Sequence, residues 1–168
     1  MSRAISICRL SNHDACQVLA IAESCGLGSW SENDYILEFE KEESIAFGAF
    51  VSAVLIGFIV GRIVPSSSGN NSHDAEIYNI GVRADEHRKG VGRMLMQNFL
   101  ETALINGADK VWLEVRSTNF AATEFYKSLG FTACGTRKAF YSSPPGDAVL
   151  MMAEASVLHP TISKESLP

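Results

Sequence analysis

Residues 76–106, EIYNIGVRADEHRKGVGRMLMQNFLETALIN, decide the fold. Their first part, Glu76–Val82, has the apolar and β-branched composition typical of a strand. From Gly90 to Asn106 the apolar side chains recur at helical spacing, and Gly107 follows as a typical C-terminal cap. The stretch therefore predicts a strand, a glycine-containing turn and a long amphipathic helix in direct succession.

The turn itself, His87–Gly92 (HRKGVG), has the features of an anion-binding site. Its two glycines let the backbone approach a ligand closely, and the free N–H groups and dipole of the helix start attract negative charge. Arg88, Lys89 and Arg93 add positive charge. The spacing fits neither a Walker loop nor the six-position glycine pattern of dinucleotide-binding folds. On these grounds alone, the turn is either a phosphate site or an ordinary strand-to-helix connection.

The segments on either side extend this pattern into a mixed α/β domain. Upstream, the spacings predict a strand at Ala4–Arg9, a helix that begins at Ser11 and a second helix from Ser31 to Glu40. An apolar hairpin follows, with strands at Ser44–Phe50 and Leu55–Val64. Downstream, they predict a strand at Lys110–Val115 and a helix at Ala121–Leu129 that ends at Gly130. Two further strands follow at Phe131–Tyr141 and Ala148–Met152. The predicted order is β-α-α-β-β-β-α-β-α-β-β.

Length and composition limit the classes of protein. With 168 residues we expect one domain over residues 1–155 and a flexible C-terminal tail over residues 156–168. The net charge of −5, from 14 basic and 19 acidic residues, argues against a protein that binds nucleic acid directly. The four cysteines form no CxxC pair, and the N-terminus lacks the apolar core of a signal peptide. We therefore expect no metal site, no disulfide framework and a cytoplasmic location.

One segment challenges the expectation of a protein without membrane contact. Ser44–Gly61 carries no charge and is long enough to span a membrane, and Gly57 and Gly61 have the spacing of membrane helix pairs. Its β-branched and aromatic residues and its glycines instead favour strands. We predict a β-hairpin that turns near Ser52-Ala53, and no membrane association.

Three segments in order, IYNIGV (77–82), HRKGVG (87–92) and WLEVRSTNFAATEFYKSLGF (112–131), resemble the GCN5-related N-acetyltransferase (GNAT) superfamily. The sequence is most similar to the RimI-type ribosomal-protein alanine N-acetyltransferases, to which the WSE of Trp30–Glu32 adds a further likeness. The resemblance implies the α/β GNAT fold, in which a mixed, mostly antiparallel central sheet is flanked by helices. It also implies that acetyl-coenzyme A is the cosubstrate and that no metal is needed.

The resemblance implies a set of cofactor contacts. Backbone amides of the turn would hold the pyrophosphate of acetyl-coenzyme A, although His87 stands where the family has Gln or Arg. The backbone at Ile80 and Val82 would pair with the pantetheine arm like an added strand, and Asn119 would hydrogen-bond the cofactor while also being a typical N-cap. The complete implied set is Ile80, Val82, His87, Arg88, Lys89, Gly90, Val91, Gly92, Arg93, Asn119 and Ala122.

Two side chains are candidates for acid–base chemistry. Glu114 lies in the apolar strand VWLEV, where a carboxylate is costly, and its match to the family's WLEVR implies a general base. Strand alternation alone would simply point Glu114 to solvent, and Glu76 is a second candidate base. Tyr126 matches the tyrosine that protonates the departing sulfur in the family; by itself it is typical of a core residue. An α-amine, with a pKa of ~8 against ~10.4 for lysine, needs only a modest base.

The expected acceptor is a protein N-terminus, namely the N-terminal alanine of a ribosomal protein, acetylated by direct attack. We expect Trp30, Tyr35, Glu76 and Tyr141 to contact it, although the three aromatic residues are equally typical of core or rim positions. Residues 32–43 contain six acidic side chains and one lysine, which suits a basic substrate but is equally typical of a solvated helix face. The alternatives are an enzyme of the same fold that acetylates a small amine, a polyamine or an antibiotic, and a non-catalytic module that binds coenzyme A.

Overall fold

The strands expected from the sequence are all present in the computed structural model, which describes residues 4–69 and 71–158. They are β1 (Ser6–Arg9), β2 (Ser44–Val51), β3 (Val54–Pro65), β4 (His73–Val82), β5 (Ala108–Arg116), β6 (Thr132–Ser142) and β7 (Pro145–Glu154). The helices are α1 (Ala15–Ser24), α2 (Glu32–Phe39), α3 (Val91–Ile105), α4 (Phe120–Ser128) and α5 (Ala155–Leu158). The short α5 was not expected; it includes the first residues of the predicted tail, and residues 159–168 lie outside the described chain.

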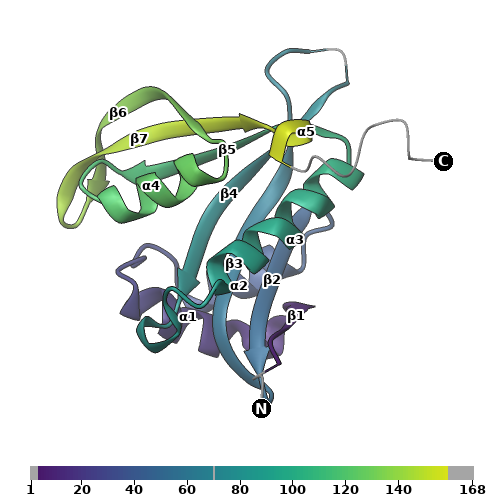
Figure 1. Ribbon diagram of the computed structural model, residues 1–168, viewed down its shortest axis with the longest axis vertical. Coiled ribbons are helices and arrows are strands. Elements are labelled where there is room, and N and C mark those ends of the chain that lie inside the picture. The colour runs from purple at the N-terminus through teal and green to yellow at the C-terminus, as the bar shows by residue number, and fades with distance from the viewer. Residues whose placement is uncertain (1–3, 70, 159–168) are drawn as a thin grey trace.

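All seven strands join one sheet in the order β1-β2-β3-β4-β5-β7-β6 (Figure 1). β4 and β5 run parallel, whereas every other neighbouring pair is antiparallel. Helices α3 and α4 cover one face of the sheet, and α1 and α2 cover the other. The mixed, mostly antiparallel sheet flanked by helices is therefore confirmed.

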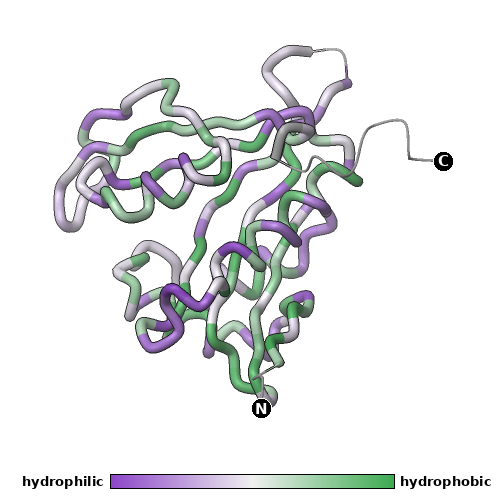
Figure 2. The backbone as a smooth tube through the Cα atoms, viewed as in Figure 1, coloured by the Kyte–Doolittle hydropathy of each residue, from purple (hydrophilic) through white to green (hydrophobic). Residues whose placement is uncertain are grey.

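Two apolar cores, one on each face of the sheet, explain the uncharged run at Ser44–Gly61. Ile56 and Ile59 of β3 belong to the core under α3, whereas Leu55 and Phe58 belong to the core under α1 and α2. A strand that is buried on both faces has no solvated position for a charge. Figure 2 shows β2 and β3 as largely hydrophobic along their length.

The hairpin turn is the one expected from the sequence. Ser52 and Ala53 have φ angles of 48° and 65°, and positive φ at both central residues is the requirement of a type I′ two-residue hairpin turn. The prediction of a β-hairpin at this segment is confirmed. Within the described part of the chain, no helix combines the length and hydropathy that crossing a membrane would need.

The sheet splits between its two parallel strands. β4 and β5 pair from His73 opposite Ala108 to Ile77 opposite Leu113, although β4 continues to Val82 and β5 to Arg116. Just past Ile77, β4 has an extra residue: Gly61 of β3 lies opposite Ile77, and the next residue, Val60, lies opposite Asn79. A bulge of this kind bends and twists its strand. Beyond it the two strands diverge, as Figure 1 shows.

We predict that Gly61→Ala destabilises the protein by about 2 kcal/mol or more, because a close-packed site cannot accept an added methyl group. A Cβ at this position would overlap the backbone oxygen of Glu76 and lie 2.7 Å from the ring of Phe99. Urea denaturation measures the free energy of unfolding. The matched control is Gly135→Ala in β6, where a Cβ would have its nearest neighbours at 3.9 Å; equal losses in the two variants would contradict the argument.

Candidate active site

The split leaves the inner edges of β4 and β5 without strand partners. Arg83 N–H donates to the Ile56 carbonyl of β3, so the peptide groups of the preceding residue, Val82, point the other way, toward the split. The Val82 carbonyl accordingly accepts hydrogen bonds from His87 Nε2 at 2.8 Å and from Cys25 Sγ at 3.4 Å. Ile80, two residues earlier, has the same orientation. Both residues expected to pair with a pantetheine arm thus face the split with their backbone groups.

The loop between β4 and α3 forms a concave backbone turn. Arg88 and Gly90 both have positive φ angles, 63° and 84°, and Gly90 is the N-cap of α3. The first bond of the helix runs from Met94 N–H to the Gly90 carbonyl, so the preceding three N–H groups point out of the helix end. A Cβ on Gly92 would lie 3.5 Å from the ring of Phe125, which places this turn against α4. This arrangement is typical of an anion-binding site at a helix N-terminus.

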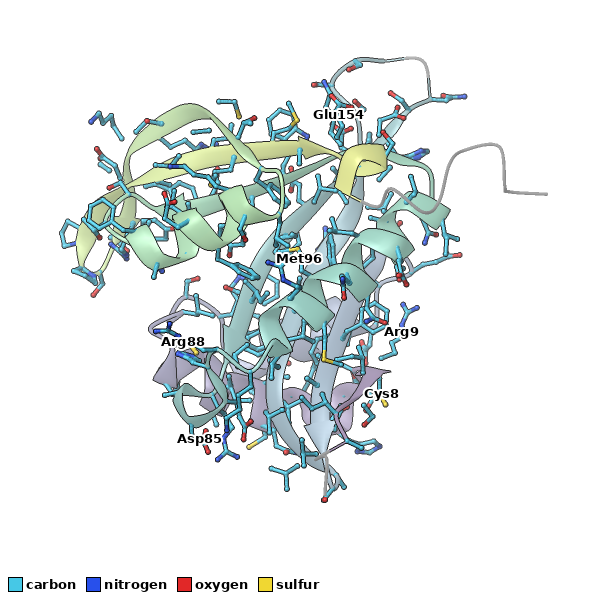
Figure 3. The ribbon with its side chains drawn as sticks, in the orientation of Figure 1. Cys8, Arg9, Asp85, Arg88, Met96 and Glu154 are labelled. Atoms are coloured by element: carbon cyan, nitrogen blue, oxygen red, sulfur yellow. The ribbon has the colours of Figure 1, made fainter. Side chains whose placement is uncertain are left out.

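The charged side chains of this loop differ in their engagement. Lys89 forms an ion pair with the buried Glu86 at 3.4 Å, and Arg93 donates to Ser128 Oγ of α4 at 3.4 Å. Arg88, whose position before α3 is labelled in Figure 3, has no ion pair or side-chain hydrogen bond among the described residues. Of these basic side chains, Arg88 has its charge least compensated by the protein.

His87, which departs from the family pattern, hydrogen-bonds the backbone of β4. Because a carbonyl can only accept a hydrogen bond, the bond to Val82 requires the proton on Nε2 of the imidazole. This bond fixes the loop against the end of β4. The anion site itself consists of backbone groups, so the substitution of His for Gln or Arg leaves it in place.

The start of α4 lies directly after β5. Asn119 is the N-cap of this helix, and its side chain accepts a hydrogen bond from Ala122 N–H at 3.1 Å. Its backbone N–H donates to the Arg116 carbonyl at the end of β5 at 2.8 Å. The expected capping role is therefore present, and the amide nitrogen of the side chain is left for a ligand. The expected contacts of Asn119 and Ala122 with the cofactor stay predictions.

Tyr126 lies in the core on the α4 side of the split. Its side chain is 7% exposed and contacts the rings of Phe125 and Phe131. Burial raises the pKa of Tyr126 well above its usual value, and the nearby Tyr141 raises it further. The hydroxyl is therefore protonated at neutral pH, as a proton donor must be, and the raised pKa makes it a weaker acid than an exposed tyrosine.

Glu114 lies one residue past the last β4–β5 pair, on the opposite face of the sheet. Its neighbours Leu113 and Val115 belong to the core under α3, so alternation turns Glu114 away from that core. The carboxylate forms an ion pair with Arg137 of β6. It lines a cavity of about 330 Å³ together with Glu76. The two candidate bases therefore share one cavity.

The pKa of Tyr141 is affected by burial and by two charged neighbours. Burial raises its pKa, Arg116 lowers it, and Glu114 raises it. The Arg116 guanidinium lies 4.0 Å from the centre of the Tyr141 ring.

Two of the aromatic residues expected to contact the acceptor, Trp30 and Tyr35, differ in their exposure. Trp30 is partly exposed and packs against Tyr78 with ring centres 5.8 Å apart. Tyr35 is 0% exposed, and its ring packs edge-on against Phe58 in the core under α1 and α2. For Tyr35 the structure therefore favours the core alternative, because its position on α2 faces the interior.

The sequence reasoning also missed charged residues that shape this face. Glu38 is buried, and Arg62 pairs with it through two hydrogen bonds. The Arg62 guanidinium also lies 5.5 Å from the centre of the Tyr78 ring. The available signals were the helical spacing of Glu38 from Tyr35 and the single charge of Arg62 at the end of an apolar run. No sequence signal indicated the pairing of Arg137 with Glu114.

Comparison with known proteins places this site in a family. Residues 15–131 match the acetyltransferase (GNAT) family. A ribosomal protein bS18-alanine N-acetyltransferase of Salmonella typhimurium is 37% identical over 86 residues, covering 50% of this chain and 58% of that relative. The enzyme of that name from Escherichia coli K12 is 29% identical over 130 residues, covering 76% and 82%.

A solved structure extends the likeness to the whole fold. The crystal structure of the ribosomal-protein-S18-alanine N-acetyltransferase from Escherichia coli has a TM-score of 0.79 at 25% identity, covering 98% of this chain and 99% of that one. The family match spans more than half of the residues and includes the anion-binding turn, Glu114 and Tyr126. The chain therefore belongs to the GNAT family of acetyltransferases.

Proposed function

We propose that this protein transfers the acetyl group of acetyl-coenzyme A to the α-amine at the N-terminus of a protein. Acetyl transfer and its donor follow from membership of the family; the acceptor and the residue roles are the proposal. The observation that carries it is the placement of Tyr126 and Glu114 on opposite faces of one split sheet. A donor held from the α3 and α4 side and an acceptor entering from the other face would meet at the split.

The chain's own residues supply binding and proton transfer. The backbone turn before α3 and the edge of β4 hold the pyrophosphate and the pantetheine arm, and the bound donor supplies an activated acetyl thioester. Glu114 takes the proton of the attacking amine, directly or through water, as the new C–N bond forms. Tyr126 gives its hydroxyl proton to the departing sulfur as the C–S bond breaks. Solvent then carries a proton from Glu114 back to the tyrosinate of Tyr126, so all atoms and protons balance without a covalent intermediate on the enzyme.

An α-amine suits this site better than a lysine side chain does. With a pKa of ~8 against ~10.4, an α-amine already has a substantial neutral fraction near neutral pH, and a carboxylate is sufficient as base. The cavity beside Glu114 is lined by one or two residues from each of β3, β4, β5, β7 and β6, so it crosses the strands diagonally, and an extended peptide would lie across the sheet in it. The names of the bacterial relatives support an N-terminal alanine of a ribosomal protein as the acceptor. Such an acceptor would place the reaction in the cytoplasm.

The test is acetylation of a panel of acceptors with acetyl-coenzyme A, followed by mass and by release of free thiol. We expect peptides with a free N-terminal alanine to be acetylated once, at the α-amine, and faster than the same peptides with a blocked N-terminus and an internal lysine. Polyamines and aminoglycosides form the second arm. Transfer only to these small amines would contradict the proposal, and cofactor binding without any transfer would identify a non-catalytic module.

We predict that Glu114→Gln lowers kcat by about 10²-fold at pH 7, the usual contribution of a positioned general base. The loss should shrink toward pH 9, because the acceptor amine then deprotonates without help. The matched control is Glu124→Gln on the exposed surface of α4, where a carboxylate pairs with Lys127. Full activity of Glu114→Gln at pH 7 would contradict this assignment, and Glu76→Gln tests the second candidate.

We predict that Tyr126→Phe slows transfer by about 10²-fold, while the Kd for acetyl-coenzyme A changes by less than about twofold. Single-turnover kinetics and calorimetry measure the two quantities separately. Tyr35→Phe is the control, because it also removes one buried tyrosine hydroxyl, here from the core under α1 and α2. That hydroxyl has no hydrogen-bond partner among the described residues. Equal losses of rate and of affinity in Tyr126→Phe would count against the role as acid.

A further inference from the structure

A groove rich in carboxylates runs from Glu114 along the face of the sheet opposite α3. We call it the acidic groove and define it by Asp74, Glu76, Trp112, Glu114, Arg137 and Leu150. It has a volume of about 330 Å³. Three of these residues are acidic and one is basic. Arg137 pairs with Glu114, and no ion pair joins Asp74 or Glu76 to a cation among the described residues; Arg62, which lies opposite Glu76 on β3, pairs with Glu38 instead.

Asp74 is the most unusual member of the acidic groove. It is 4% exposed, and its Oδ2 accepts hydrogen bonds from Trp112 Nε1 at 3.0 Å and from Ser66 Oγ at 3.2 Å. Its other oxygen, Oδ1, is buried without any hydrogen-bond partner among the described residues. A buried carboxylate is costly unless its oxygens are paired, and half of this one is not. One oxygen of this carboxylate is therefore without a hydrogen-bond donor from the described residues.

The strand register relates Asp74 to the site of chemistry. Glu76 lies opposite Trp112, Asp74 is two residues before Glu76, and Glu114 is two residues past Trp112. Asp74 and Glu114 are thus about four strand positions apart along the sheet, or ~13 Å. A peptide whose α-amine lies at Glu114 and whose chain follows the groove covers ~7 Å with its first two residues. A long side chain at residue 2 or 3 spans the rest.

The walls of the acidic groove indicate which side chain this is. The incomplete carboxylate requires a donor, and the neighbouring Glu76 adds a second negative charge. Trp112 adds an aromatic wall whose indole N–H is already committed to Asp74. Carboxylates beside an aromatic wall suit a basic side chain, and arginine in particular because its planar fork pairs with carboxylates and stacks on rings.

We propose that the acidic groove is a specificity subsite, in which Asp74 and Glu76 bind a basic side chain at residue 2 or 3 of the acceptor peptide. The inference rests on the proposed function, because it assumes a peptide acceptor with its α-amine at Glu114. It makes Asp74 a residue that selects the substrate and takes no part in the proton transfers. The acidic stretch at residues 32–43, partly on α2 of the same face, adds the same sign of charge at longer range.

The test compares hexapeptides that begin with alanine and differ only in having Arg, Gln or Glu at residues 2 and 3. For the wild-type enzyme we expect kcat/KM to be about tenfold higher with Arg than with Gln, the usual size of one charge-assisted hydrogen bond, with Glu the poorest. In Asp74→Asn, which can still accept the bonds from Trp112 and Ser66, the Arg-to-Gln ratio should fall to within about twofold of one, through KM.

Two further variants make the result decisive. Glu76→Gln should also lower the ratio, and it serves if Asp74→Asn fails to fold. Glu23→Gln, an exposed carboxylate of α1 outside the groove, should keep the full ratio. Equal rates with all wild-type substrates, or an unchanged ratio in both groove variants, would overturn the subsite and leave the proposed function intact. If no peptide of any sequence is acetylated, the proposed function falls and the subsite falls with it.

Discussion

The place where β4 stops pairing with β5 governs the rest of the structure. A parallel pair that continued past Ile77 and Leu113 would satisfy the inner edges of both strands and leave no backbone groups for a ligand. The bulge on β4 after Ile77 prevents this, and the close contact of Gly61 with Phe99 holds β3 and α3 together at the same level. The open edges are polar groups that must find a partner. An extended, hydrogen-bonding arm is the partner that such a split edge accommodates.

The split also separates the chemistry into two faces. Tyr126 is held in the α4 core with its proton retained by burial, whereas Glu114 stands on the other face beside a cavity. Neither environment would serve the other group. A carboxylate in the position of Tyr126 would be buried without a partner, and a tyrosine in the position of Glu114 would be too weak a base near neutral pH. In the proposed reaction, the sheet therefore separates the acetyl donor from the acceptor amine everywhere except at the split.

Much of this arrangement was accessible from the sequence because it depends on local signals. Three of these signals each act within a few residues: the hairpin turn at Ser52-Ala53, the cap of α2 by Ser31 and Asp34, and the glycine turn before α3. Tyr35 was misplaced because helical spacing gives an apolar stripe without saying whether that stripe faces the core or a cleft. Arg137 with Glu114, and Asp74 with Trp112, join residues 23 and 38 positions apart. Such contacts depend on strand order and register, which one sequence does not specify.

The same distinction explains why the donor is easier to assign than the acceptor. The proposed donor site consists of backbone: the left-handed turn at Arg88 and Gly90, the helix end and the edge of β4. Backbone groups persist through side-chain substitution, so His87 replaces Gln or Arg without removing the site. The acceptor face consists of side chains from β4, β5 and β6, and each substitution there changes shape or charge. A family that keeps its backbone turn and varies this face retains one acetyl donor while its acceptors diverge. In the proposed subsite, the carboxylates at Asp74 and Glu76 are therefore the features of this face that would select among acceptors.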